Sequence, residues 1–282
     1  MVKFYGAHVS VAGGFENAIA NARELGVNAI QVHPSPPQRW NSKPYPEGYE
    51  KNFIDAREAS EVKRVFFHAI YLVNLVTPDS LKLEKAKQSL THYLNLSARI
   101  GGDGVVVHVG SLKDEPDDMK GYKRAAKAID EILKESDPKS RLILEVAAGA
   151  GKVVGSQLLE LRTIYDHLSD RDRVGYGLDT QHMWASGYDW QNNLDGIMED
   201  IESTFSFDKV WCIHLNDSKT ELASKKDRHE NLGDGLIGET ALRAFLSRSE
   251  LTDIPVILET PALKDIESAK GEVQRLREYI EG

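Results

Sequence analysis

Eight short apolar segments recur along the chain, and a stretch of helical patterning separates each of them from the next. The segments are rich in β-branched and aromatic residues, as strands are. They cover residues 3–9, 28–33, 64–69, 104–109, 141–146, 174–179, 209–215 and 255–259. Strands that alternate with helices pair in parallel, because each helix returns the chain to the same end of the sheet. The repeat therefore predicts an α/β protein with a parallel sheet.

The intervening helices carry recognisable start and stop signals. The clearest is predicted over about 79–100, after Pro78 and before Gly101. One apolar stripe along it is formed by Leu83, Ala86, Leu90 and Leu94. Further helices are expected over 15–25 and 265–280. Eight such units in 282 residues predict a (β/α)8 TIM barrel that forms a single domain over 1–282. An open doubly wound sheet is the alternative, but it rarely needs eight units.

Nine side chains of metal-ligand type lie on or just after the predicted strand ends. They are His68, His108, Glu145, Asp179, His182, His214, Asp227, His229 and Glu259. Side chains alternate between the faces of a strand, so those at the carboxyl ends of barrel strands converge over the barrel mouth. The long connections after the second and seventh strands, 34–45 and 216–237, lie at the same face.

Each of these residues also has an ordinary structural interpretation. A single strand-end histidine is usually a hydrogen-bonded core or loop residue, Asp179 can cap the following helix, and Glu145 and Glu259 can form a buried ion pair. Nine titratable groups at one mouth are costly to bury without cations, however. Imidazoles and carboxylates without thiolates suit Zn²⁺, and also Mn²⁺ or Fe²⁺. Nine ligands exceed the needs of one ion, and clustered divalent ions are typical of phosphoester hydrolysis.

Composition narrows the function classes further. The net charge of −9 argues against non-specific coating of nucleic acid, so any contact with DNA is expected on one face. There is no run of 18 apolar residues, so we expect no membrane span. The single cysteine, Cys212, lies in an apolar strand and is expected to pack in the core; with no signal-peptide pattern, this favours the cytoplasm.

Seven sequence motifs contain most of the ligand-type residues or precede them. They are GAHVSVAGG (6–14), FHAIYLVNL (67–75), HVGS (108–111), GLDTQH (177–182), HLNDSK (214–219), DRHENLGDGLIG (227–238) and LETP (258–261). These motifs resemble those of the endonuclease IV family of apurinic/apyrimidinic endonucleases. The resemblance runs from residue 4 to about 261 in the family's order, and the succession of HLNDSK and DRHENLGDG is its most specific part.

The resemblance implies a TIM barrel with three zinc ions at its mouth. The implied ligand sets are His68, His108 and Glu145; Glu145, Asp179, His214 and Glu259; and His182, Asp227 and His229. Glu145 would bridge two ions, and Glu145 and Glu259 are the candidate catalytic residues. The implied reaction hydrolyses the phosphodiester 5′ to an abasic site in double-stranded DNA. It leaves a 3′-hydroxyl and a 5′-deoxyribose phosphate.

The same resemblance suggests contacts with DNA. Tyr71 matches a residue that the family inserts at the damage, and Gln38 or Arg39 stands near the position of the family's minor-groove arginine. Lys219 and Arg228 could contact phosphates, although acidic residues alternate with them in a mixed-charge loop. The chain departs from the family after Glu145, where Val146 and Ala147 replace the usual Asn-Thr. The change removes two polar groups beside the predicted metal site, so we expect altered metal tuning or affinity.

Two other functions fit part of the pattern. A sugar isomerase or epimerase on a related barrel would need one ion, held by Glu145, Asp179, His214 and Glu259. The remaining five ligand-type residues would then have no task. A non-catalytic damage-binding relative would keep the metal ligands but lose the chemistry. We expect a monomer, since no exposed heptad pattern calls for a dimer.

Overall fold

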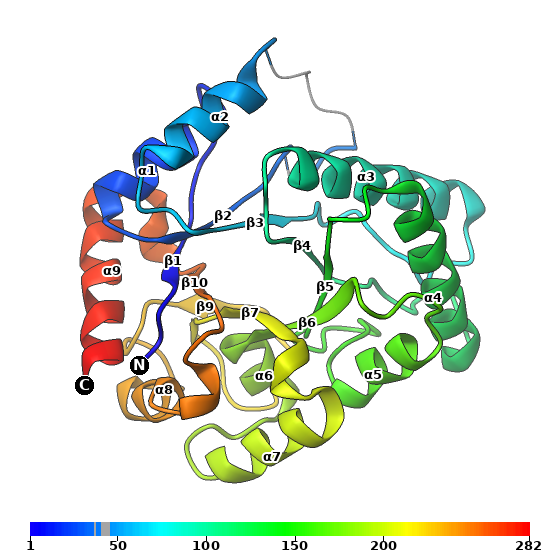
Figure 1. Cartoon of the computed structure of the whole chain (residues 1–282). Helices are drawn as coiled ribbons and strands as arrows, with labels where there is room; N and C mark the ends of the chain where they lie inside the picture. Colours follow the sequence, from blue (N-terminus) through cyan, green and yellow to red (C-terminus); the bar gives the residue numbers. More distant parts are fainter. Residues whose placement is uncertain (37, 41–45) are drawn as a thin grey trace.

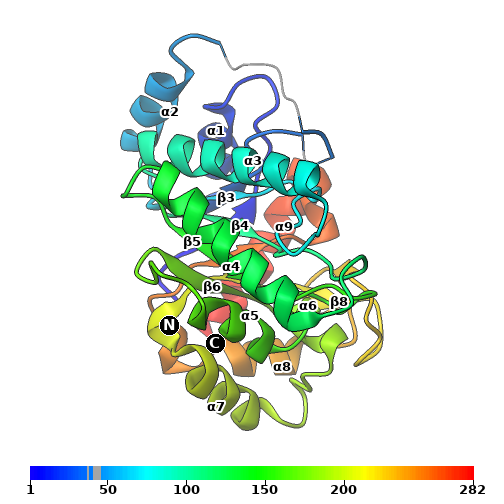
Figure 2. The same ribbon diagram turned by 90° about the vertical axis from the view of Figure 1, so that its right-hand side faces the viewer.

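The computed structural model describes residues 1–36, 38–40 and 46–282. Pro37 and residues 41–45 of the long connection after the second strand lie outside the described residues. Eight parallel strands close into a barrel in the order β1-β10-β7-β6-β5-β4-β3-β2. The predicted TIM barrel is confirmed, and the alternative of an open sheet is wrong. The helices form a ring around the strands, and the two chain ends lie near one another (Figures 1 and 2).

The barrel strands lie close to the predicted segments. They are β1 (Tyr5–His8), β2 (Ala29–Val32), β3 (Arg64–His68), β4 (Gly104–Val107), β5 (Leu142–Glu145), β6 (Val174–Asp179), β7 (Val210–His214) and β10 (Val256–Leu258). The helices are α1 (Asn17–Leu25), α2 (Tyr49–Glu58), α3 (Ser80–Arg99), α4 (Asp118–Glu135), α5 (Leu158–Asp166), α6 (Thr180–Ser186), α7 (Leu194–Phe205), α8 (Glu239–Leu246) and α9 (Ile266–Glu281). Three short 3₁₀ turns lie among them at Phe207–Lys209, Ser249–Leu251 and Pro261–Lys264.

Local chemistry explains where the helices begin and end. Asp79 caps α3 because its carboxylate accepts hydrogen bonds from the N–H groups of Leu81 and Lys82. Gly26 ends α1 with a φ of 67°, a left-handed conformation that glycine adopts without a steric penalty. The signals at Pro78 and Gly101 therefore bracket α3 as predicted.

An apolar layer fills the barrel directly below the mouth. Its buried residues are Ala29, Phe66, Val106, Ile143, Cys212 and Ile257. Two positions further along each strand, on the same face, stand Gln31, His68, His108, Glu145, His214 and Glu259. The alternation of the strands thus seats polar side chains on an apolar floor. Cys212 packs in this layer, as expected from the sequence.

One element of the fold was not foreseen. Residues Asp217–Ser218 (β8) and His229–Glu230 (β9) form a separate two-stranded antiparallel ribbon beyond the end of β7. The ribbon lies beside α6 at one side of the barrel (Figure 2). It pairs Ser218 with His229, which carries His229 back toward the barrel mouth. None of the helices that the structure describes is long and apolar enough to cross a membrane.

Candidate metal centre

Eight of the nine predicted ligands have atoms that come together at the barrel mouth, in three overlapping clusters. Asp227, the ninth, lies at the edge of the third cluster. Glu145 belongs to two clusters and Asp179 to two, so the three clusters form one continuous centre. Glu145 and Asp179 are fully buried, and His68, His182 and His214 are at most 4% exposed.

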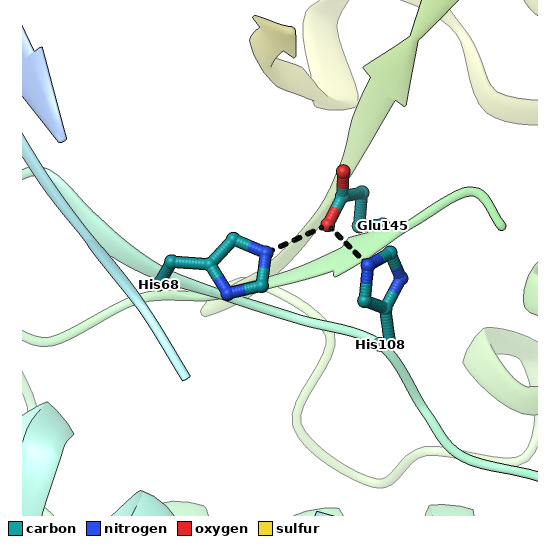
Figure 3. Close-up of side chains that lie close together, drawn as sticks. All are labelled: His68, His108 and Glu145. Atoms are coloured by element: carbon teal, nitrogen blue, oxygen red, sulfur yellow. Dashed lines mark hydrogen bonds and ion pairs between the residues drawn. The ribbon is translucent and has the colours of Figure 1, made fainter. Parts of the chain in front are cut away.

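The first cluster consists of His68, His108 and Glu145, from β3, the end of β4 and β5 (Figure 3). Both imidazoles point their Nε2 atoms at the same carboxylate oxygen. Oε2 of Glu145 lies 3.1 Å from Nε2 of His68 and 3.3 Å from Nε2 of His108. The Nε2 atoms of His68 and His108 therefore converge on Oε2 of Glu145, as the donor atoms of one metal site do.

The second cluster adds the other oxygen of Glu145 to Asp179, His214 and Glu259. Nδ1 of His214 lies 2.7 Å from Oε1 of Glu145, 3.4 Å from Oε2 of Glu259 and 3.9 Å from Oδ2 of Asp179. Three carboxylates therefore surround one imidazole nitrogen. Asp179 also caps α6, because its Oδ1 accepts from the N–H of His182 at 2.8 Å. The capping and cluster positions of Asp179 use different oxygens, so the two interpretations are compatible.

The third cluster consists of Asp179, His182 and His229. The exposed carboxylate of Asp227 lies 3.4 Å from Nε2 of His182 and 3.3 Å from Nε2 of His229. The structure thus brings together the predicted set of His182, Asp227 and His229, and adds Asp179 to it. Nε2 of His229 is buried and accepts or donates no hydrogen bond among the described residues.

Main-chain carbonyls set the tautomers of three of these histidines. Nδ1 of His68 bonds to the carbonyl of Ala69, Nδ1 of His182 to that of Val146, and Nδ1 of His229 to that of Glu259. A carbonyl only accepts, so each ring carries its proton on Nδ1 and turns Nε2 to the cluster. In metal sites the nitrogen away from the ion commonly donates in this way.

Attraction between imidazoles and carboxylates shifts the pKa values of both kinds of group in the centre. Burial would raise the pKa of Glu145 and Glu259, but the surrounding histidines outweigh it and hold both pKa values well below the usual range. Burial would lower the pKa of His182, yet Asp179, Asp227 and Glu145 raise it to about 10. The carboxylates are therefore charged, and the positive charge beside them is supplied by protons on imidazoles.

The donor set fits divalent metal ions better than it fits a set of ion pairs. Among the described residues, the ion-pair partners of Glu145, Asp179 and Glu259 are all histidines, and none is a lysine or an arginine. An ion bound by neutral imidazoles would replace the shared protons and would supply the missing partner of His229 Nε2. The absence of thiolates and the mixture of nitrogen and oxygen donors match Zn²⁺, Mn²⁺ or Fe²⁺.

Several residues that hydrogen-bond to the cluster residues were not predicted from the sequence, because they are not of metal-ligand type. Gln31 is fully buried on β2, and Asn216 is fully buried after β7. Nδ2 of Asn216 donates to Oδ2 of Asp179, while its Oδ1 accepts from the N–H of Glu259. The available signal was a polar residue inside an otherwise apolar strand, as in the AIQV of β2.

Asp217 organises the loop that supplies the third cluster. Its buried carboxylate accepts hydrogen bonds from the N–H groups of Ser218, Gly233, Gly235, Ile237 and Gly238. Five backbone donors on one carboxylate compensate for its complete burial. The motif HLND therefore combines a cluster residue, His214, with two supporting residues.

Of the predicted DNA contacts, Tyr71 lines both cavities beside the clusters, whereas Gln38 and Arg39 line a separate hollow beside α3. Tyr71 is 63% exposed, and Gln38, Arg39, Lys219 and Arg228 are exposed. Lys219 lies 3.6 Å from Glu230, so part of its charge is compensated within the loop. Burial raises the pKa of Tyr71 to about 12, with help from Glu259 and Asp227, so its hydroxyl stays protonated.

Two cavities flank the centre, and Tyr71 lies between them. The first, of about 530 Å³, is walled by Ala147, Ala148 and Val153 beside His108 and His182. The second, of about 850 Å³, is lined by His8, Ser10 and His33 beside His229 and Glu259. Ala147 helps to make the first wall apolar. The support of His182 comes from the main chain of Val146 and does not depend on the Val146 side chain.

Comparisons with known proteins agree with this architecture. The model of the xylose isomerase-like TIM barrel family matches residues 19–279. A probable endonuclease 4 of Halothermothrix orenii is 36% identical over 93% of this chain and 96% of its own. The chain belongs to the endonuclease IV family. An apurinic-apyrimidinic endonuclease of Caenorhabditis elegans is 34% identical over 92% of this chain and 66% of its own length.

Solved structures extend the comparison. The crystal structure of endonuclease IV from Thermus thermophilus matches with a TM-score of 0.87 and 31% identity, over 99% of each chain. A D-tagatose 3-epimerase-like protein matches with a TM-score of 0.77 at 16% identity, which shows a shared fold alone. The family assignment thus rests on the endonuclease IV relatives.

Proposed function

We propose that this chain is a metal-dependent apurinic/apyrimidinic endonuclease that hydrolyses the DNA phosphodiester 5′ to an abasic site. The products would be a 3′-hydroxyl and a 5′-deoxyribose phosphate. The proposal includes three zinc ions, with Mn²⁺ or Fe²⁺ as substitutes. One ion would be held by each cluster, with Asp227 joining His182 and His229 at the third.

The observation that carries the proposal is the sharing of carboxylates between clusters. Glu145 belongs to the first and second clusters, and Asp179 to the second and third. Ligands shared in this way would hold neighbouring ions close enough to act on one phosphate. A single-ion sugar isomerase would use only the second cluster, and the first and third would be surplus.

Bound divalent ions would supply activation of water and neutralisation of charge on the phosphate oxygens. The chain's own part is to keep the centre rigid. Carbonyls and Gln31 fix the imidazole rings, and Asn216 and the α6 N-terminus fix Asp179. Of the two candidate catalytic residues, Glu259 lines the larger cavity, and Glu145 is fully buried where the first and second clusters meet.

The rim would position the DNA. Tyr71 projects between the two cavities and is mostly exposed, as an inserted side chain needs to be. Removal of a base weakens stacking, so a base-free sugar is the cheapest nucleotide to turn out of the duplex. Gln38 and Arg39 on one side, and Lys219 and Arg228 on the other, would contact the DNA backbone.

The test is cleavage of a duplex oligonucleotide with one abasic-site analogue, with and without a chelator. We expect metal-dependent cleavage 5′ to the lesion, and its loss in His229→Ala. His167→Ala is the matched control, because His167 also bonds a main-chain carbonyl through Nδ1 but lies at the end of α5. Full metal loading without cleavage would contradict the proposal and favour the damage-binding alternative.

We also propose that residues 1–282 act as one catalytic domain, that the protein works as a monomer, and that it resides in the cytoplasm. Light scattering of the purified protein at several concentrations tests the second point. A constant mass near 31.5 kDa is the expected result.

A further inference from the structure

Two histidines at the barrel mouth belong to none of the three clusters. His8 ends β1 and His33 follows β2, and their ring centroids are 4.5 Å apart. Both line the cavity of about 850 Å³ that also borders His229 and Glu259. They therefore stand where a group attached to a bound phosphate would lie.

The tautomer of His8 follows from Gln31. One amide atom of Gln31 lies 2.5 Å from Oε1 of Glu259, and a carboxylate only accepts, so that atom is the amide nitrogen. The same nitrogen lies 3.1 Å from Nδ1 of His8, closer than Oε1 of Glu259 at 3.5 Å, and gives Nδ1 its second hydrogen. Nδ1 of His8 thus accepts, and the ring proton lies on Nε2. His8 offers the cavity an N–H donor.

The tautomer of His33 is the opposite one. Its Nδ1 lies 3.1 Å from the main-chain carbonyl of His68, which accepts, so the proton lies on Nδ1. Nε2 of His33 keeps its lone pair. Among the described residues, no hydrogen-bond partner occupies Nε2 of either His8 or His33. One donor and one acceptor are therefore available side by side.

We propose that His8 and His33 form a subsite for one hydroxyl group of the substrate. A hydroxyl both donates and accepts, so it satisfies both rings at once, whereas a carbonyl or an ether can only accept. Resting on the proposed function, the hydroxyl is that at C1′ of the ring-closed, base-free deoxyribose. An intact nucleotide carries its base at C1′ and has no such hydroxyl.

The position of the subsite supports this choice of group. The cavity shares Glu259 and His229 with the metal centre, so a sugar attached to a phosphate at the centre reaches it directly. The other cavity, with its wall of Ala147, Ala148 and Val153, carries no comparable pair of histidines beyond the cluster residues. His8 and His33 thus determine which sugar is accepted. They do not bind metal ions, which the three clusters would hold.

The experiment compares two duplexes that differ by one oxygen. One carries a natural abasic site, made by removal of uracil, and the other carries the tetrahydrofuran analogue, which lacks the C1′ hydroxyl. We expect the wild-type protein to cleave the natural site with kcat/KM about 10-fold higher, the effect of two neutral hydrogen bonds. His33→Phe keeps a flat ring but removes the acceptor and leaves the donor of His8, so its preference should fall to about 3-fold while tetrahydrofuran cleavage is retained.

Metal content per chain and the control His167→Phe complete the design. The inference is overturned if wild-type protein shows no preference, if His33→Phe keeps the preference, or if it slows both substrates equally. It is also overturned if His33→Phe loses bound metal, since His33 would then be a ligand. If wild-type protein cleaved both duplexes at the same rate, this inference would be wrong but the proposed function would still hold. Cleavage of neither duplex by wild-type protein would overturn the proposed function and this inference together.

Discussion

Gln31 and His214 are joined by a hydrogen bond that decides which nitrogen of His214 faces the metal centre. Oε1 of Gln31 lies 2.8 Å from Nε2 of His214, and the bond of the Gln31 amide nitrogen to Glu259 identifies this atom as the oxygen. Nε2 of His214 therefore donates, and Nδ1 turns to Glu145. His214 is thus oriented by a side chain, whereas three other histidines of the centre are oriented by carbonyls.

We expect Gln31→Met to lower metal affinity at the second cluster by about 10- to 100-fold. Methionine has a similar length but cannot accept from His214 or donate to Glu259. Competition with a chromophoric chelator measures the affinity. In zinc-loaded protein, long-range ¹H–¹⁵N spectra of the imidazoles should show faster exchange of the His214 Nε2 proton in the variant.

Asn28→Leu is the control for this prediction. Asn28 precedes β2 and makes two hydrogen bonds, with the N–H of Tyr5 and the carbonyl of Lys3, at the other end of the strand. It should reduce stability without changing metal affinity. Equal affinity in Gln31→Met and wild-type protein would show that packing alone orients His214.

The barrel and the six ligand-type residues at its strand ends were predictable, because both follow from periodicities in the sequence. Strand alternation places His68 two positions after the buried Phe66, and Glu145 two positions after Ile143. The oxygen atoms that accept hydrogen bonds from the imidazole rings and orient them were not predictable in the same way. The carbonyl of Val146 supports His182 whatever its side chain is, so no residue type signals that contact.

The positions of the cluster residues that lie in loops were even harder to predict from the sequence. The ribbon of β8 and β9 has only two residues in each strand, too few for any alternation to show. His229 reaches the mouth because Ser218 pairs with it and because Asp217 binds five backbone N–H groups around it. The sequence marked Asp227 and His229 as ligand-type residues, the resemblance to the family grouped them with His182, and the structure supplies the physical reason for the position of His229.

Asp217→Asn should loosen the loop that carries His229. The amide retains one acceptor oxygen but places an NH₂ group against backbone donors, so buried hydrogen bonds are lost. We expect the free energy of unfolding to fall by about 2–4 kcal/mol, with faster amide exchange at Gly233 to Gly238. Urea unfolding and hydrogen exchange measure the two effects. Asp234→Asn, which removes an exposed ion pair 3.1 Å long with Arg275, should change stability by under about 0.5 kcal/mol.

Metal binding to chelator-treated protein should release protons. His182, with its pKa raised to about 10, and His214, with its pKa raised well above 6.5, are protonated at neutral pH in the metal-free protein, but a ligand must be neutral. His108, with its pKa lowered to about 4 by burial and neighbouring histidines, is already neutral and releases none. Metal affinity should therefore increase as pH rises from 6 to 9.

Calorimetric titration with zinc in buffers of different ionisation enthalpy measures the release. The apparent enthalpy should depend on the buffer, with the slope giving the number of protons. The carboxylates add none, because the pKa values of Glu145, Glu259 and Asp227 are lowered and these groups are already charged. A buffer-independent enthalpy at pH 7 would contradict protonation of His182 and His214.

The sharing of Glu145 between two clusters predicts that its loss costs more metal than the loss of a residue from one cluster. Glu145→Gln removes a charge from both the first and the second clusters, so we expect two ions to be lost per chain, as measured by elemental analysis after dialysis. His229→Ala should remove only the ion of the third cluster. Glu115→Gln is the control, because Glu115 is a buried carboxylate that pairs with Arg124 away from the mouth. Loss of a single ion in Glu145→Gln would mean that Glu145 serves one ion only, since a bridging carboxylate cannot be weakened for one partner without being weakened for the other.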